Sequence, residues 1–174
     1  LAVSPRNPDV LWVGTDDGAL WVTKDGGREW VNVWDKLGLP GPRFDGTIEA
    51  SRFADGRAYV AIDGHRNDDD ACYLLATQDF GQTWTRLGGT TVEGWAHCLR
   101  EDLKNEDLLF AGTELAPWAS LDQGKTWHRL RGANLPTVAI QDFAIHPTAG
   151  EIVAATHGRS LWLLDISALR QITP

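Results

Sequence analysis

Four carboxylates, each following a short apolar-rich run, are the residues with the clearest chemical potential: Asp16, Asp17, Asp63 and Glu114. Two carboxylates held about 5–9 Å apart across a cleft can cleave a glycosidic bond, one as the acid and the other as base or nucleophile. We therefore treat these four residues as candidate catalytic groups. The competing interpretation is that they are solvated loop residues.

Further polar and aromatic residues occupy comparable places between predicted strands. Carboxylate, imidazole, guanidinium and indole groups gathered on one face could bind a sugar or a peptide. The predicted binding face consists of Asp16, Asp17, Asp63, His65, Arg66, Trp95, Glu114, His157 and Arg159.

One acidic run, Asp68–Asp70, raises the question of a metal. Carboxylate oxygens bind Ca²⁺, but this run lacks the spaced pattern of a tight calcium loop. The five histidines show no paired zinc spacing. We predict no metal and no cofactor, with Ca²⁺ as the alternative. Cys72 and Cys98 are expected to be free thiols.

The composition limits the class of protein. The chain has 174 residues, a formal net charge of −8 and 43% hydrophobic residues. An acidic chain without a basic cluster argues against nucleic acid as a partner. No apolar run approaches the ~20 residues of a membrane span. The chain opens at Leu1 without Met or a signal peptide, so we expect a piece of a longer protein.

A repeated motif must position these residues. The pattern Ser/Thr-x-Asp-x-Gly-x-x-Trp occurs three times, with its aspartates at positions 25, 79 and 122. We name these segments, residues 23–30, 77–84 and 120–127, the aspartate turns. A weaker fourth landmark, Asp165, follows at the same interval but lacks the glycine and tryptophan. The aspartates are thus 54, 43 and 43 residues apart, and a recurrence at this spacing indicates a repeat architecture.

The segments between these landmarks are short, rich in β-branched or aromatic residues, and bounded by Gly, Pro, Asn and Asp, which predicts strands. Four antiparallel strands per repeat correspond to one propeller blade. We predict an all-β fold, a β-propeller domain over residues 1–174 with blades at about 1–40, 41–92, 93–136 and 137–174. The last blade is expected to have a weak outer strand at Leu169–Thr173. Four blades could close as a small ring, but an open arc, completed by other blades or another chain, is favoured.

The aspartate turns are predicted to be structural. The Asp carboxylate can accept backbone N–H bonds, the Gly can supply positive φ, and the Trp ring can pack beneath the turn. The residues assigned this role are Thr23, Asp25, Gly27, Trp30, Thr77, Asp79, Gly81, Trp84, Ser120, Asp122, Gly124 and Trp127.

This motif resembles the Asp-box, or BNR, repeat of sialidases, sortilin-type domains and xyloglucanase-like propellers. The stretch Ala155–Ser167 looks like part of large bacterial proteins with sortilin-like propellers. The resemblance implies a secreted or periplasmic protein. It also places Asp16 loosely at the catalytic Asp of xyloglucanase-like enzymes, although Ala19 replaces a second glycine. No arginine triad of a sialidase is recognisable.

Two functional hypotheses follow. The first is a non-catalytic binding or scaffold module that presents its loop face to a glycan, a peptide or a partner subunit. The alternative is part of a glycoside hydrolase with a two-carboxylate mechanism, in which Asp16 or Asp17 works with Asp63, Glu114 or a group outside this chain.

Overall fold

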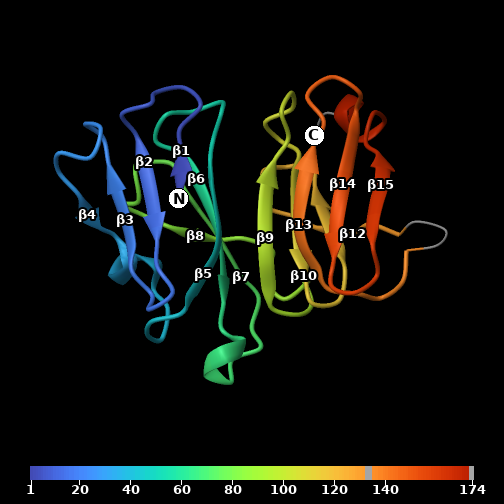
Figure 1. The fold of residues 1–174 in the computed structure, drawn as a ribbon, viewed down its shortest axis with the longest axis horizontal. Helices are drawn as coiled ribbons and strands as arrows, with labels where there is room; N and C mark the ends of the chain where they lie inside the picture. The colour runs from blue at the N-terminus through green and yellow to red at the C-terminus, as the bar shows by residue number, and fades with distance from the viewer. Residues whose placement is uncertain (132–134, 173–174) are drawn as a thin grey trace.

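The computed structural model describes residues 1–131 and 135–172 as four antiparallel sheets standing side by side (Figure 1). Each sheet is a meander in which consecutive strands pair. The predicted all-β propeller fold is confirmed, and each sheet is one blade.

The first two blades each contain four strands. Blade 1 consists of β1 (Ala2–Val3), β2 (Leu11–Gly14), β3 (Leu20–Thr23) and β4 (Val31–Asn32), followed by the 3₁₀ helix η1 (Trp34–Leu37). Blade 2 consists of β5 (Phe44–Ala50), β6 (Ala58–Asp63), β7 (Tyr73–Thr77) and β8 (Thr85–Arg86), with η2 (His65–Asn67) between β6 and β7.

Blades 3 and 4 differ in completeness. Blade 3 consists of β9 (Ala96–Glu101), β10 (Leu109–Thr113), β11 (Pro117–Ser120) and β12 (His128–Arg129). Blade 4 has three strands in the described residues, namely β13 (Ile140–Ile145), β14 (Glu151–Thr156) and β15 (Leu161–Asp165), followed by η3 (Leu169–Gln171).

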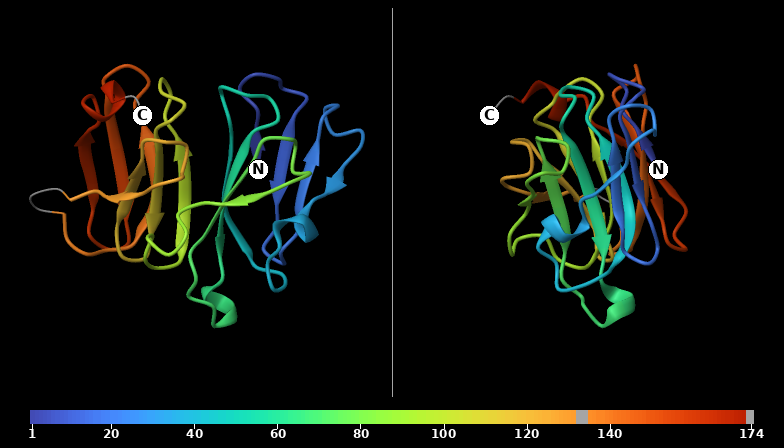
Figure 2. Two further views of the ribbon diagram at one scale, coloured as in Figure 1. Left: turned by 180° about the vertical axis from the view of Figure 1, so that it is seen from behind. Right: turned by 90° about the vertical axis from the view of Figure 1, so that its left-hand side faces the viewer.

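The first strand of each blade lies beside the first strand of the next, so β5, β9 and β13 form the inner side of an arc (Figures 1 and 2). Arg100 on β9 links them: its guanidinium lies 3.1 Å from Glu49 on β5 and 2.8 Å from Asp142 on β13. Burial raises the pKa of Glu49, although Arg100 opposes this shift.

The hydrophobic core is divided between the blade interfaces. Three clusters form, each built from two adjacent blades. Strand β7 shows the reason: Tyr73 and Leu75 pack toward blade 1, while Leu74 and Ala76 pack toward blade 3. Successive side chains of a strand point to opposite faces. A central strand buried on both faces therefore reads as a continuous apolar run.

The predicted fourth strand of blade 4 is wrong for the described part of that segment, because Leu169–Gln171 forms a 3₁₀ helix; Thr173 lies outside the described residues. Arg170 explains the difference. Its guanidinium reaches the buried carboxylate of Asp102 on blade 3 at 2.7 Å and 3.0 Å. Burial would raise the pKa of Asp102, but the bonds from Arg170 hold it below its usual range. The chain after β15 is thus fixed across blade 3 instead of along β15.

A second buried carboxylate joins blades 2 and 3. Glu101 accepts hydrogen bonds from Ser51 Oγ at 2.8 Å and from the Arg52 backbone N–H at 2.9 Å. Burial raises the pKa of Glu101 despite these bonds. A buried carboxylate needs such partners, since an unpaired buried charge is strongly destabilising.

Candidate functional site

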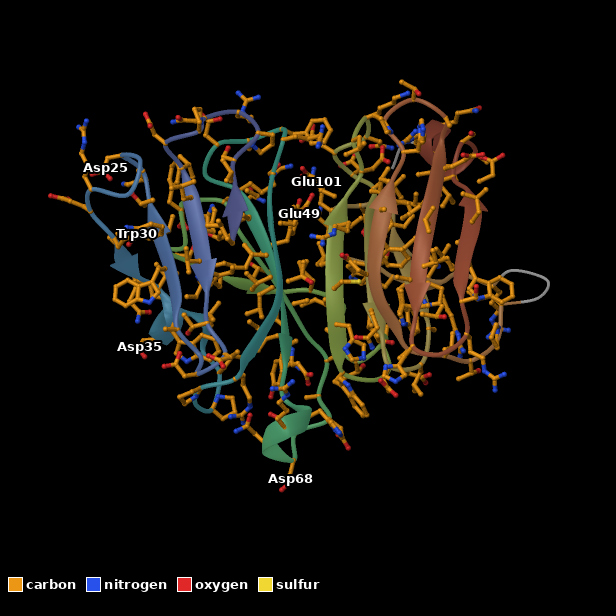
Figure 3. All side chains as sticks on the ribbon, viewed as in Figure 1. Asp25, Trp30, Asp35, Glu49, Asp68 and Glu101 are labelled. Carbon is orange, nitrogen blue, oxygen red and sulfur yellow. The ribbon has the colours of Figure 1, made fainter. Side chains whose placement is uncertain are left out.

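The antiparallel blades place two kinds of loop on opposite sides of the arc. Asp25, in the first aspartate turn, and Asp68, after η2, are labelled at opposite ends of the molecule in Figure 3. We call the side with the aspartate turns the turn face. The opposite side, with residues 15–19, 64–72, 114–116 and 157–160 and the inter-blade segments 38–43 and 92–95, is the loop face.

The aspartate turns repeat one hydrogen-bond pattern. In the second turn, Asp79 accepts bonds from Thr77 Oγ1 at 2.8 Å and from the Thr83 backbone N–H at 2.8 Å. Thr83 Oγ1 donates a further bond at 2.6 Å, and these bonds lower the pKa of Asp79 to about 2. The residue after each Asp also adopts positive φ, and in two turns it is Phe80 or Gln123 instead of glycine. Each of the three carboxylates is therefore held by hydrogen bonds from its own turn.

The turns also pack against the preceding blade. A Cβ placed on Gly81 would meet Val33 of blade 1 at 3.0 Å, and one on Gly124 would meet Leu87 of blade 2 at 2.8 Å. Trp127, in blade 3, is only 3% exposed, whereas Trp30, in blade 1, is 37% exposed. The tryptophan is therefore a blade-to-blade contact wherever a preceding blade is present.

On the loop face, a polar pocket of about 250 Å³ lies between blades 1 and 2. It is lined by Asp16, Asp17, Pro42, Arg43, Arg66 and Asn67. Gly18 has φ +85°, and a Cβ there would lie 2.6 Å from Pro42, so the two loops are in tight contact. The sequence prediction included Asp16, Asp17 and Arg66 but missed Arg43.

Arg43 is held in place from behind the pocket. Its guanidinium lies 3.2 Å from Asp69, which also accepts a 2.7 Å hydrogen bond from Tyr73 Oη. The bond from Tyr73 is the main reason that the pKa of Asp69 is lowered. Arg43 Nε is buried and has no hydrogen-bond partner among the described residues. Arg43 thus lines the pocket while Asp69 fixes its guanidinium.

A second group of predicted residues meets between blades 2 and 3. The rings of His65 and Trp95 stack at 4.0 Å with an interplanar angle of 11°. The edge of His97 contacts the same indole, and His97 Nε2 lies 3.0 Å from Glu114. One face of the Trp95 indole, a member of the predicted binding face, is thus covered by His65. His97 lies within β9, at the point where the β9–β10 register shifts.

The residues of the predicted binding face therefore divide between the polar pocket, the cluster around Trp95 and a separate part in blade 4. Asp63 joins the second group by accepting the His65 backbone N–H at 2.8 Å. His157 and Arg159 lie in blade 4, where the His157 N–H bonds to Ala139 and the Arg159 carbonyl accepts the Trp162 indole at 2.9 Å. Blade 4 is at the end of the arc, away from the pocket between blades 1 and 2 (Figure 1).

The candidate catalytic carboxylates do not face one another across a pocket. Asp16 and Asp17 are adjacent in sequence and are the only carboxylates among the residues lining the polar pocket. Asp63 holds the turn of η2, and Glu114 is paired with His97. Among the residues that line it, the polar pocket therefore does not combine carboxylates from two different loops, as the paired mechanism of a glycoside hydrolase would require.

The described residues contain no group of three or more His, Cys, Asp or Glu side chains arranged to hold a metal ion. In the acidic run, Asp69 bonds to Arg43 and Asp70 lies 3.3 Å from His65 Nδ1. Cys72 and Cys98 are free thiols, and burial raises the pKa of each to about 12. Across residues 1–131 and 135–172, no helix has the length and apolar character needed to cross a membrane.

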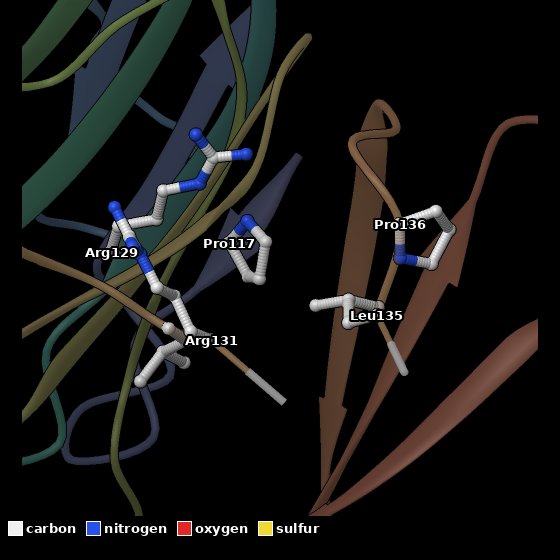
Figure 4. Close-up of a pocket in the computed structure, with 6 residues that line it drawn as sticks. Pro117, Arg129, Arg131, Leu135 and Pro136 are labelled. Atoms are coloured by element: carbon white, nitrogen blue, oxygen red, sulfur yellow. The ribbon is translucent and has the colours of Figure 1, made fainter. Parts of the chain in front are cut away.

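A further pocket, of about 370 Å³, lies at the outer edge of blade 3 (Figure 4). Its lining includes Pro117, Arg129, Arg131 and Pro136. Arg129 is committed to structure, because its guanidinium donates to the Leu115 carbonyl and to Thr137 Oγ1, each at 3.3 Å.

Comparisons with known proteins support the fold. No family profile and no curated protein matches the sequence. Among solved structures, the GH74 xyloglucanase from Xanthomonas campestris is 18% identical, with a TM-score of 0.70 over 92% of this chain and 26% of that one. YCF48 bound to D1 peptide is 19% identical, with a TM-score of 0.63 over 95% of this chain and 54% of that one.

A third similar structure is the extracellular domain of the B. thetaiotaomicron protein BT4673, which is 17% identical with a TM-score of 0.65. This likeness covers 89% of this chain and 19% of that one. The chain thus spans about a quarter or less of the xyloglucanase and of BT4673, and about half of YCF48. At these identities, the likeness shows a β-propeller fold.

Proposed function

We propose that this chain is a non-catalytic binding module of an exported protein and that its loop face holds the ligand. The observation that carries the proposal is the polar pocket between blades 1 and 2. It combines two carboxylates with two guanidinium groups and the Asn67 amide, so it offers acceptors and donors on one rigid wall. Such a mixed lining suits a ligand rich in hydroxyl or amide groups, namely a glycan or a peptide.

The preorganisation of the loops favours binding. Thr15 Oγ1 donates to Asp17, and the Ala19 backbone N–H donates to Thr15 Oγ1 at 2.9 Å, so this loop is fixed before any ligand arrives. A loop that is already ordered loses little conformational entropy on binding. The second group, around Trp95, extends the same face toward blade 3.

The only carboxylates among the residues lining the polar pocket, Asp16 and Asp17, come from one loop, which favours binding over hydrolysis in this pocket. The similar structures include a xyloglucanase and a propeller bound to a peptide, which is compatible with either ligand class. The likeness to an extracellular domain supports the proposed export. No observation favours a hydrolase within this chain over the binding module.

The test is a screen of the purified chain against glycan and peptide arrays, followed by calorimetric titration of each hit. Asp16→Asn should weaken binding at least about tenfold if the carboxylate accepts ligand donors. Asp35→Asn, at an exposed aspartate of η1 that does not line the pocket, is a matched control. Each glycan hit is also incubated with the chain and assayed for new reducing ends. Release of reducing ends by the chain, abolished in Asp16→Asn, would establish the hydrolase instead.

A further inference from the structure

The two ends of the arc each leave one side of a blade uncovered (Figure 1). The head face is the outer side of blade 1, where Val13, Thr15, Trp21 and Trp30 line an open pocket of about 450 Å³. The tail face is the outer side of blade 4, where Leu161 and Leu163 are 67% and 63% exposed. Both faces are apolar, and exposed apolar patches of this kind mark interaction surfaces.

The tail face has the residue pattern of a buried interface elsewhere in the chain. Leu161 begins the third strand of blade 4, as Leu20 begins that of blade 1, and each is followed two residues later by an aliphatic side chain. In blade 1 these two residues, Leu20 and Val22, are buried against blade 2. The tail face therefore presents the surface that normally receives the next blade.

The head face has the complementary pattern. Trp21 pairs with Val13 across β2 and β3, on the side of blade 1 that points away from blade 2. The corresponding side of blade 3 carries Trp118 on its third strand, which is buried against blade 2. The head and tail faces are therefore the two halves of the interface that occurs three times within the chain.

The charged residues where the head and tail faces meet the loop face are complementary. The polar pocket shows that the loops of neighbouring blades meet, since Asp16 and Asp17 of blade 1 line it with Arg66 of blade 2. On the tail face the corresponding loop, between β14 and β15, carries Arg159. A tail face placed against a head face therefore brings Arg159 toward two aspartates, whereas two head faces would bring four aspartates together.

The charged residues where the head and tail faces meet the turn face are also complementary. Lys24 of the first aspartate turn lies 5.4 Å from the ring of Phe80 in the second, so the turns of neighbouring blades also meet. The first aspartate turn carries Arg28 as well, while Glu151 and Asp165 pair across the corresponding end of blade 4. Opposite charges again meet only in a head-to-tail arrangement.

We propose that the head face of one copy of this chain docks on the tail face of a second copy. Both halves of the interface are present on each chain, so a second copy supplies the half that each face lacks. The contact is heterologous, because different surfaces of the two copies meet. This self-association uses surfaces separate from the polar pocket of the loop face.

The test measures the mass of the chain by size-exclusion chromatography with light scattering over a wide concentration range. The wild-type chain should self-associate, while Leu163→Glu on the tail face and Trp21→Glu on the head face should each give monomers. Val13→Glu is a second head variant should Trp21→Glu fail to fold, as judged by circular dichroism. Leu115→Glu, at an exposed loop-face leucine, is the matched control and should associate as the wild type does.

The decisive measurement is the mass of a mixture of the tail variant Leu163→Glu and the head variant Trp21→Glu. Each heterodimer can combine the intact head of Leu163→Glu with the intact tail of Trp21→Glu, so mixing two monomeric variants should restore a dimer. A wild-type chain that stays monomeric at every concentration would overturn the proposal, as expected if another protein covers these faces. Association that survives both variants, or a mixture that stays monomeric, would overturn it as well.

Discussion

The same blades build the turn face and the loop face, but the turns repeat from blade to blade whereas the loops differ. On the turn face, the three aspartate turns repeat the same side-chain and backbone bonds: Gly27, Gly81 and Gly124 each donate to the hydroxyl four residues earlier. On the loop face, each blade has a loop of different length and chemistry, from the 3₁₀ helix of blade 2 to the short turn of blade 3.

This difference indicates that the turn face stabilises the fold and that the loop face binds the ligand. Identical turns close the blades and pack them together, because the same contact must form at each interface. Loops that need not match are available for a ligand. Stability should therefore depend on the turn face, most strongly where a preceding blade is present, and binding should depend on the loop face.

The largest expected effect compares two tryptophans of the aspartate turns. Trp127→Ala should lower the free energy of unfolding by about 3–5 kcal/mol, because it empties a buried site between blades 2 and 3. In the monomeric chain, Trp30→Ala should cost less than about 1 kcal/mol, because this ring is 37% exposed at the head face when no second copy is bound. Urea denaturation of both variants measures the two values, and equal losses would contradict the role of the preceding blade.

The same contrast applies to the glycines beneath these rings. Gly124→Ala should cost about 2–4 kcal/mol, because positive φ disfavours alanine and its Cβ would lie 2.8 Å from Leu87. Gly27→Ala should cost about 1–2 kcal/mol, since it meets nothing closer than the Trp30 ring at 3.6 Å. Thermal unfolding of the pair checks the order, and a larger loss at Gly27 would rule out this packing.

Lowering the pH should destabilise the aspartate turns and with them the folded chain. Hydrogen bonds from Thr83 hold the pKa of Asp79 at about 2, and the backbone N–H of Glu29 is the main group lowering the pKa of Asp25. In the unfolded chain, aspartate has a pKa of about 3.9, so as the pH falls the unfolded chain takes up protons on these carboxylates before the folded chain does. Stability should therefore be complete above about pH 4 and fall toward pH 2. Asp79→Asn should flatten this fall in urea titrations, and an unchanged slope would exclude the carboxylate as its source.

The smallest effect is expected on the loop face. The stacked pair of His65 and Trp95 is partly exposed. A double-mutant cycle with His65→Ala and Trp95→Ala should give a coupling energy of about 1 kcal/mol or less. A coupling near that of a buried aromatic pair would show that these loops also carry the fold.

The repeat predicted the blades because its period and punctuation are properties of the sequence alone. The 3₁₀ helix Leu169–Gln171, found where a fourth strand of blade 4 was predicted, could not be foreseen, since Arg170 meets Asp102, 68 residues away in sequence, only in the folded chain. The cluster around Trp95 was partly predicted from loop positions. His97 was missed because it meets Glu114 only in the folded chain, at the point where the β9–β10 register shifts. Arg43 was missed because it follows a proline and joins no repeated pattern.

The central claim, a binding loop face on a structural turn face, is tested most directly by titrating the chain with its best array ligand while following the indole N–H signals of its nine tryptophans. We expect the Trp95 signal to shift with saturation, while those of Trp30, Trp84 and Trp127 stay in place. Shifts at the three aspartate-turn indoles with Trp95 unmoved would place the ligand on the turn face and contradict the account.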